Sequence, residues 1–221
     1  MQKLIDGLHK FKSDVFNPNQ ELFRPLVDGQ RPEVLFITCS DSRIDPNLIT
    51  QTNPGELFIL RNAGNIIPPY GPGNGGAAAT VEFAVLALGV RYIIVCGHTN
   101  CGAISALLNP SVLKDAPAMR DWLVHAEATR RVVVENYQDI TGPALHTVAV
   151  EENVLTQIEH LRTHPAVRSR LACGKLSLHA WVYKLETGEV YQYDSAQGQY
   201  VSFTRSAPLS PVTPGDRLGN L

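Results

Sequence analysis

The chain has 221 residues, of which 44% are hydrophobic and 18% charged, and nineteen basic side chains against twenty-one acidic ones give a formal net charge of -2. This length and composition predict one globular domain with a sizeable core. The charge balance argues against general nucleic-acid binding, which needs a basic surface to neutralise phosphates. Small, weakly charged substrates are not excluded.

The sequence carries no sign of membrane insertion or export. No apolar run approaches the roughly 20 residues that a membrane helix requires. The N-terminal stretch MQKLIDGLHKFKSDVF mixes charges into its apolar positions and lacks the apolar centre of a signal peptide. We therefore expect a cytoplasmic protein with no membrane partner, in which thiols stay reduced. Its cysteines are then metal ligands, catalytic groups or small core residues rather than disulfides.

The first predicted element is an amphipathic helix that forms an arm over residues 1–17. Its apolar side chains recur at spacings of four, three and four, at Leu4, Leu8, Phe11 and Val15. Two prolines and Gly29 then separate the arm from the first strand. A helix detached in this way must bury its apolar stripe, either on its own domain or on a partner subunit, and the sequence leaves both open.

Apolar runs at 34–38, 57–60 and 92–96 predict the first strands. Each run is nearly continuous rather than alternating, which is typical of parallel strands covered on both faces. Helical periodicity predicts helices over 77–88, 119–137 and 148–162. The segment 176–194 reads as two strands joined by a turn at Gly188, which predicts a hairpin.

Together these elements predict an α/β fold. We expect a mainly parallel central sheet with an antiparallel edge strand, flanked by helices, and a protruding N-terminal helix. Residues 1–205 form a single catalytic domain in this interpretation. From residue 206 the chain carries three prolines and little to bury, so residues 206–221 are expected to be a flexible C-terminal tail.

Residues with metal-binding and acid–base chemistry follow two of the predicted strands. Cys39 ends the first strand, with Asp41 and Arg43 in the turn after it, and His98 and Cys101 follow the third strand. If those strands are parallel neighbours, the five side chains meet at the carboxyl edge of the sheet. That edge is where open α/β sheets bind their ligands.

Two thiolates and one imidazole are a donor set that suits zinc, and three protein ligands leave a fourth position open for catalysis. A structural zinc would usually bring four ligands, and the spare thiols fit that alternative poorly. Cys96 lies inside a strand, and Cys173 stands alone between a helix and the hairpin. A zinc ion with two thiolates and a neutral histidine has no net charge and acidifies water weakly. A carboxylate at Asp41, kept ionised by Arg43, would support a zinc-bound hydroxide; the alternative is an exposed ion pair of little consequence.

Three motifs in this order and at these separations resemble the β-class carbonic anhydrases. They are CSDSR at 39–43, RNAGN at 61–65 and CGHTNCGA at 96–103, and the resemblance runs from the N-terminal helix to about Phe203. It implies a carbonate dehydratase that reversibly hydrates carbon dioxide to bicarbonate and a proton through zinc-bound hydroxide. It also implies one zinc ion per chain and a homodimer or an assembly of dimers.

The resemblance assigns roles residue by residue. The implied zinc ligands are Cys39, His98 and Cys101, and the implied catalytic dyad is Asp41 with Arg43. Gln30 and the backbone N–H of Gly102 are implied to hydrogen-bond substrate or product oxygens. Phe58 matches an apolar wall of the substrate pocket in the family.

Location and activity each have an alternative. The runs CSDSRIDPNLITQ and RNAGNIIPPYG look most like enzymes of cyanobacterial carboxysomes, so the carboxysome lumen is the alternative to the cytoplasm. An enzyme on the same fold that hydrolyses carbonyl sulfide or carbon disulfide would carry the same zinc motif. A zinc-binding protein without turnover is the alternative from a different functional class.

Overall fold

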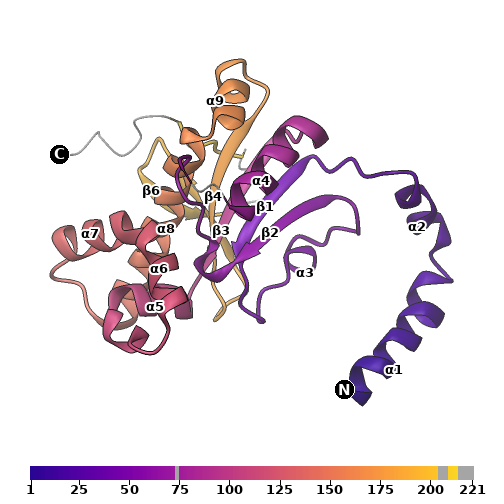
Figure 1. Ribbon diagram of the computed structural model, residues 1–221, viewed down its shortest axis with the longest axis horizontal. Helices are drawn as coiled ribbons and strands as arrows, with labels where there is room; N and C mark the ends of the chain where they lie inside the picture. The colour runs from indigo at the N-terminus through magenta and orange to yellow at the C-terminus, as the bar shows by residue number, and fades with distance from the viewer. Residues whose placement is uncertain (73–74, 204–208, 214–221) are drawn as a thin grey trace.

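The computed structural model describes residues 1–72, 75–203 and 209–213 (Figure 1). Within this part of the chain one six-stranded sheet forms in the order β2-β1-β3-β4-β5-β6. The strands are β1 (Val34–Cys39), β2 (Leu57–Asn62), β3 (Tyr92–His98), β4 (Ser177–Tyr183), β5 (Val190–Asp194) and β6 (Gln199–Ser202). The first four strands are parallel, and β5 and β6 are antiparallel. The predicted fold class is confirmed, with two antiparallel strands instead of a single edge strand.

The strand order reverses direction at β1. The chain passes from β1 to β2 on one side and then crosses to β3 on the other side, so β1 has both as parallel neighbours. In this register Cys39 pairs with Asn62, and Thr38 pairs with Cys96. The carboxyl ends of β1, β2 and β3 therefore lie together at a topological switch point, where such sheets place their ligands.

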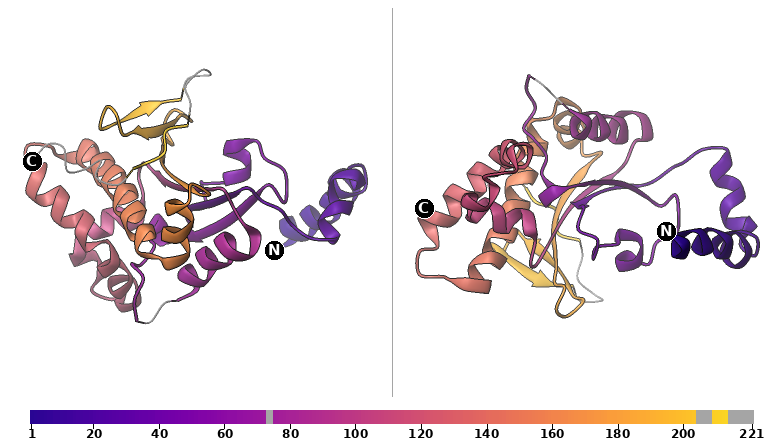
Figure 2. Two further views of the ribbon diagram at one scale, coloured as in Figure 1. Left: turned by 90° about the horizontal axis from the view of Figure 1, so that it is seen from above. Right: turned by 60° about the horizontal axis from the view of Figure 1, so that its bottom comes forward.

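Helices surround the sheet in the two further views (Figure 2). They are α1 (Gln2–Lys10), α2 (Gln20–Val27), α3 (Pro46–Thr50), α4 (Gly76–Glu82), α5 (Gly102–Leu108), α6 (Pro117–Leu123), α7 (Glu127–Asn136), α8 (Gly142–Thr163) and α9 (Pro165–Ala172). Stretches of π-helix extend α1 and α4, as η1 (Phe11–Phe16) and η3 (Phe83–Leu88). Short 3-10 turns are η2 (Ala63–Asn65), η4 (Pro110–Leu113) and η5 (Val124–Ala126).

The main core lies between one face of the sheet and α4, α5, α8 and α9. The side chains of Leu35, Ile93 and Leu178 on the strands are fully buried against the helices, and so are Val154 and Ile158 of α8. This close approach needs a glycine in β3. A Cβ atom on Gly97 would lie 2.7 Å from Cγ2 of Val154, a separation that packed carbon atoms do not reach.

A smaller apolar cluster forms on the opposite face of the sheet. Phe36, Ile94 and Cys96 are buried there, and the indole of Trp181 contacts both Phe36 and Phe203 edge-on. Burial raises the pKa of the Cys96 thiol to about 12. Cys96 is therefore an inert core residue, as its position inside a strand predicted.

Several helix boundaries differ from those predicted. The helix expected over 119–137 is interrupted by η5 between α6 and α7, and α8 begins at Gly142 rather than near 148. Pro165 ends α8 as expected but also begins α9, because a proline fits the first position of a helix, where its missing N–H is not needed. The third strand is also longer than predicted and extends to His98.

The N-terminal arm projects away from the rest of the molecule (Figure 1). None of the residues of α1, η1 or α2 is buried, and the apolar side chains of Leu4 and Leu8 are 64% and 69% exposed. Phe23 of α2 contacts the rings of Phe11 and Phe16, at centroid distances of 5.9 and 5.0 Å, which holds the arm together. The apolar stripe predicted from the sequence is therefore not buried on its own domain.

Part of the expected C-terminal tail contacts the domain. The backbone N–H of Val212 donates to the carbonyl of Leu178 over 2.8 Å, and Arg162 donates to the carbonyl of Val212 over 2.6 Å. The rest of the expected tail, residues 206–208 and 214–221, lies outside the described residues. No helix in the described ranges combines the length and apolar character needed to cross a membrane.

The contact of Gly97 with α8 gives a stability prediction. Gly97→Ala should lower the free energy of unfolding by about 1–3 kcal/mol, because the added methyl group overpacks the interface with Val150 and Val154. Gly76→Ala is the matched control, since no described residue places an atom within 4 Å of a Cβ atom there. Urea unfolding at one protein concentration and saturating metal measures both variants; equal stabilities would contradict the packing argument.

Candidate metal centre

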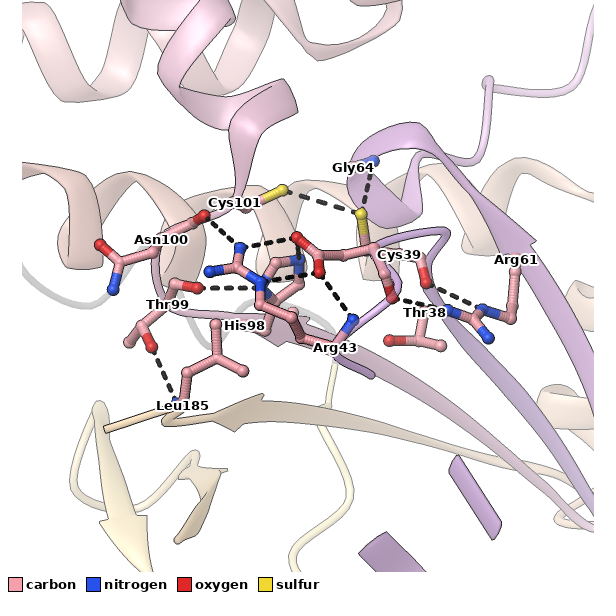
Figure 3. Close-up of polar contacts among 12 residues, drawn as sticks. Thr38, Cys39, Arg43, Arg61, Gly64, His98, Thr99, Asn100, Cys101 and Leu185 are labelled. Atoms are coloured by element: carbon pink, nitrogen blue, oxygen red, sulfur yellow. Dashed lines mark hydrogen bonds and ion pairs between the residues drawn. The ribbon is translucent and has the colours of Figure 1, made fainter. Parts of the chain in front are cut away.

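Three potential metal ligands converge at the carboxyl edge of the sheet (Figure 3). Cys39 is the last residue of β1, His98 is the last residue of β3, and Cys101 immediately precedes α5. Their ligand atoms lie within 4.8 Å of one another, and the two sulfur atoms are 3.9 Å apart. In the described part of the chain, no other group of three or more cysteine, histidine or acidic side chains comes together in this way.

The imidazole of His98 is oriented for ligation by a backbone contact. Its Nδ1 lies 2.8 Å from the carbonyl oxygen of Thr99, so Nδ1 carries the proton and donates it. The other nitrogen, Nε2, is buried and has no hydrogen-bond partner among the described residues. A buried, unpaired lone pair is costly. This nitrogen is therefore suited to bind a partner from outside the protein, such as a metal ion.

The two thiols are electrostatically coupled. The contact with the Cys101 thiol, together with the nearby His98 and the N–H of Gly64, lowers the pKa of Cys39 to about 4. The same interaction with Cys39 raises the pKa of Cys101, and burial adds to the effect. The contact therefore favours the thiolate form of Cys39, and a cation there would also favour loss of the proton from Cys101.

Asp41 and Arg43 form a forked ion pair beside the three ligands. The Arg43 Nε and Nη2 donate to the two carboxylate oxygens of Asp41 over 2.9 and 2.7 Å. Arg43 Nη2 also donates to the carbonyl of Asn100 over 3.0 Å, which fixes the guanidinium to the loop after β3. These hydrogen bonds hold the pKa of Asp41 well below its usual range. Its Oδ2 lies 3.8 Å from Nε2 of His98, at the edge of the ligand group.

Two charged residues that the sequence did not single out for the metal centre hold its loops. Arg61 of β2 donates to the carbonyls of Cys39 and Asp41, over 3.0 and 2.8 Å, and so clamps the turn after β1. Glu186, in the turn between β4 and β5, accepts from Thr99 and Asn100 over 2.7 and 2.6 Å. Arg61 opens the RNAGN motif, but nothing in the local pattern around Glu186 indicates this contact.

The remaining predicted site residues are divided between this edge and more distant positions. Gly102 is the first residue of α5, directly after Cys101, and within the described ranges nothing lies within 4 Å of a Cβ atom built on it. Phe58 pairs with Leu35, four residues before the Asn62–Cys39 pair, so it lies about 13 Å along the strand from Cys39. Gln30 is exposed in the connection between α2 and β1. The chain's own fold therefore does not bring Phe58 or Gln30 to the metal centre.

Comparison with known proteins gives one consistent family. The family model described as carbonic anhydrase matches residues 34–190. A curated carbonic anhydrase from Synechocystis sp. is 53% identical over 203 residues, which cover 91% of this chain and 74% of the relative.

Solved structures agree with that family. The β-carbonic anhydrase CcaA shares 53% identity with a TM-score of 0.90, and the match covers 92% of this chain and 99% of that chain. A tetrameric β-carbonic anhydrase from Sordaria macrospora is 27% identical with a TM-score of 0.78, over 86% of this chain and 95% of that one.

The geometry predicts which cysteines retain a metal ion. Cys39→Ser and Cys101→Ser should each lose bound metal, because a thiolate supplies negative charge that an alcohol does not. Cys173→Ser is the matched control, since this thiol is exposed and lies outside the ligand group. Metal content by mass spectrometry measures all three variants. Full occupancy in either ligand variant would contradict the assignment.

Proposed function

This chain belongs to the β-class carbonic anhydrases, and we propose that it reversibly hydrates carbon dioxide to bicarbonate and a proton with one zinc ion per chain. The observation that carries the proposal is the unpaired Nε2 of His98, which faces two thiols beside an ionised carboxylate. This arrangement combines a metal-binding group with a hydrogen-bond acceptor of fixed charge.

The donor set fits zinc in chemistry and in spacing. Zinc–sulfur bonds of about 2.3 Å in a tetrahedral site put two sulfur ligands about 3.8 Å apart. The sulfur atoms of Cys39 and Cys101 are 3.9 Å apart, and His98 offers the third donor. Three protein ligands leave one tetrahedral position for a small molecule, which favours a catalytic site over a structural one.

Zinc bound here would supply a Lewis acid that makes water a nucleophile near neutral pH. Two thiolates reduce its charge, so the surrounding residues must help to position the attacking oxygen. Asp41 is suited to this task. Arg43 keeps its carboxylate ionised, and Oδ2 accepts only one of the three hydrogen bonds that Arg43 donates to Asp41. Oδ2 can therefore accept a hydrogen bond from an O–H group and orient it without taking up the proton itself.

Substrate binding is proposed to use Gly102, Gln30 and Phe58. The N–H of Gly102 is at the start of α5, where backbone donors lack intrahelical partners, and it is suited to a carbon dioxide or bicarbonate oxygen. Gln30 and Phe58 are distant from the metal centre of their own chain, so their proposed roles require a second copy of the chain. This requirement supports a homodimer or an assembly of dimers.

A stopped-flow assay of carbon dioxide hydration, with metal analysis on the same sample, tests the activity. Arg43→Ala should lower turnover by two or more orders of magnitude without loss of metal, because the carboxylate of Asp41 is no longer held away from the metal position. Arg130→Ala is the matched control, since Arg130 forms a similar forked pair with Glu127 on α7.

The same assay separates the alternative functions. Wild-type protein with zinc and no carbon dioxide turnover would contradict the proposal. If that protein hydrolysed carbonyl sulfide, the proposed function would be replaced by that of the related hydrolase. If it turned over neither substrate, the proposed function would be replaced by that of a non-catalytic zinc protein. Full activity of Arg43→Ala would remove the dyad from the mechanism while leaving the metal assignment intact.

The exposed arm provides the test of assembly. Deleting residues 1–16 should give unstable or aggregating protein, because the apolar surface that the arm covers on a partner becomes exposed. Replacing Leu4, Leu8 and Phe11 together by serine should have the same effect. The matched control replaces Lys3, Asp6 and Lys10, on the other side of the same helix, by serine. Light scattering after size-exclusion chromatography measures the mass, and a fully active monomer after the deletion would contradict the proposed assembly.

A further inference from the structure

The turn after β2, which contains the RNAGN motif, donates a hydrogen bond to a metal ligand. The backbone N–H of Gly64 lies 3.4 Å from the sulfur of Cys39 (Figure 3). The backbone of Gly64 is in the left-handed region, with φ of 79°, and a Cβ atom there would lie 3.1 Å from Cβ of Ala103. Glycine is therefore the residue that lets this N–H point at the sulfur without strain.

The peptide unit that carries this N–H is held at its other end by Trp122. The carbonyl of Ala63 and the N–H of Gly64 belong to one planar trans peptide, so they point in opposite directions. The indole N–H of Trp122, on α6, donates to the Ala63 carbonyl over 2.8 Å. A continuous line of donors and acceptors therefore runs from the indole through one peptide group to the sulfur of Cys39.

The neighbouring peptide groups are also fixed. Asn153 of α8 donates to the carbonyl of Gly64 over 3.0 Å, and the buried Gln157 in turn donates to Asn153 over 3.0 Å. Asn62 closes the turn through two 2.8 Å hydrogen bonds with the backbone of Ile66. Because both peptides that flank Gly64 are held, the N–H cannot turn away from the sulfur without breaking other contacts.

We propose that Trp122 is a positioning residue for the metal centre: it fixes and polarises the Ala63–Gly64 peptide, so that the Gly64 N–H stabilises the thiolate of Cys39. Hydrogen bonds in line polarise one another, and a donor to an anionic acceptor is stronger than a neutral pair. This inference rests on the proposed zinc centre. Trp122 is not one of the three metal ligands, and it acts through one peptide group.

Trp122→Phe removes the N–H and keeps an aromatic ring. We expect zinc transfer to a chelator to become faster by on the order of tenfold, as found when partners of metal ligands are removed. Trp122→Leu, the second variant, also lacks the N–H but carries no aromatic ring, and it should behave like Trp122→Phe. His125→Ala is the matched control, because it removes the ring that packs edge-on against Trp122 and leaves the indole N–H in place.

A spectroscopic measurement tests the hydrogen bond itself. In protein loaded with ¹¹³Cd in place of zinc, the Gly64 amide proton should show scalar coupling to the metal through the sulfur. The coupling should weaken or vanish in Trp122→Phe and persist in His125→Ala. Its absence from the wild type, or equal coupling and equal zinc transfer in wild type and Trp122→Phe, would overturn the inference.

The experiment also distinguishes failure of the inference from failure of the proposed function. Wild-type protein that binds no metal through Cys39 would contradict the proposed zinc centre and the inference together. Suppose instead that the wild-type protein binds metal and hydrates carbon dioxide, and that Trp122→Phe and His125→Ala change zinc transfer equally. Only the role of Trp122 would then be overturned, since packing rather than the N–H would explain the effect.

Discussion

The parallel pairing of β1 with β3 is the constraint on which the metal centre depends. Cys39 and His98 are separated by nearly sixty residues, yet each stands at the carboxyl end of its strand, and the register aligns Thr38 with Cys96. The hydroxyl of Thr38 adds a 2.8 Å hydrogen bond to the carbonyl of Cys96 and ties the two strands just below the ligands. A slip of one residue would turn the side chains to the opposite face of the sheet. Ligand geometry is therefore set by the backbone, and α8 secures it by packing against Gly97.

Charged side chains surround the metal ligands at this edge of the sheet. At the centre, the two thiols contact each other, and among the described residues Nε2 of the imidazole has no hydrogen-bond partner. Around them, Arg43 and Arg61 hold the carboxylate and the carbonyl groups of the turn after β1, so that Asp41 faces the ligands with a fixed charge. These hydrogen bonds make the short turn after β1 rigid. Catalysis that depends on the orientation of the reacting groups requires such rigidity. The arginines contribute through geometry as much as through charge, because a planar guanidinium can serve several acceptors at once.

Features that depend on residue type and local spacing could be predicted from the sequence. Continuous apolar runs predicted β1 to β3, and the positions of Cys39, His98 and Cys101 after those runs predicted their convergence. Helix boundaries were predicted less well, because the same local pattern is compatible with more than one structure. The helix expected over 119–137 breaks at η5, and Pro165 begins a helix as well as ending one. Contacts such as Glu186 with Asn100, or Trp122 with Ala63, join segments far apart in the chain. Such contacts leave no periodic pattern in the sequence, so they can be identified only in the folded chain.

The stretch at 209–213 lies against an edge of the sheet. β5 pairs with β4 only from Trp181 to Tyr183, so no described strand pairs with the first half of β4 on that side. An unpaired strand edge is a template on which another chain can add a strand. Val212 occupies that edge by donating to Leu178, and its side chain is buried there. Val212, one of the last described residues, thus fills the gap that the short β4–β5 hairpin leaves beside β4.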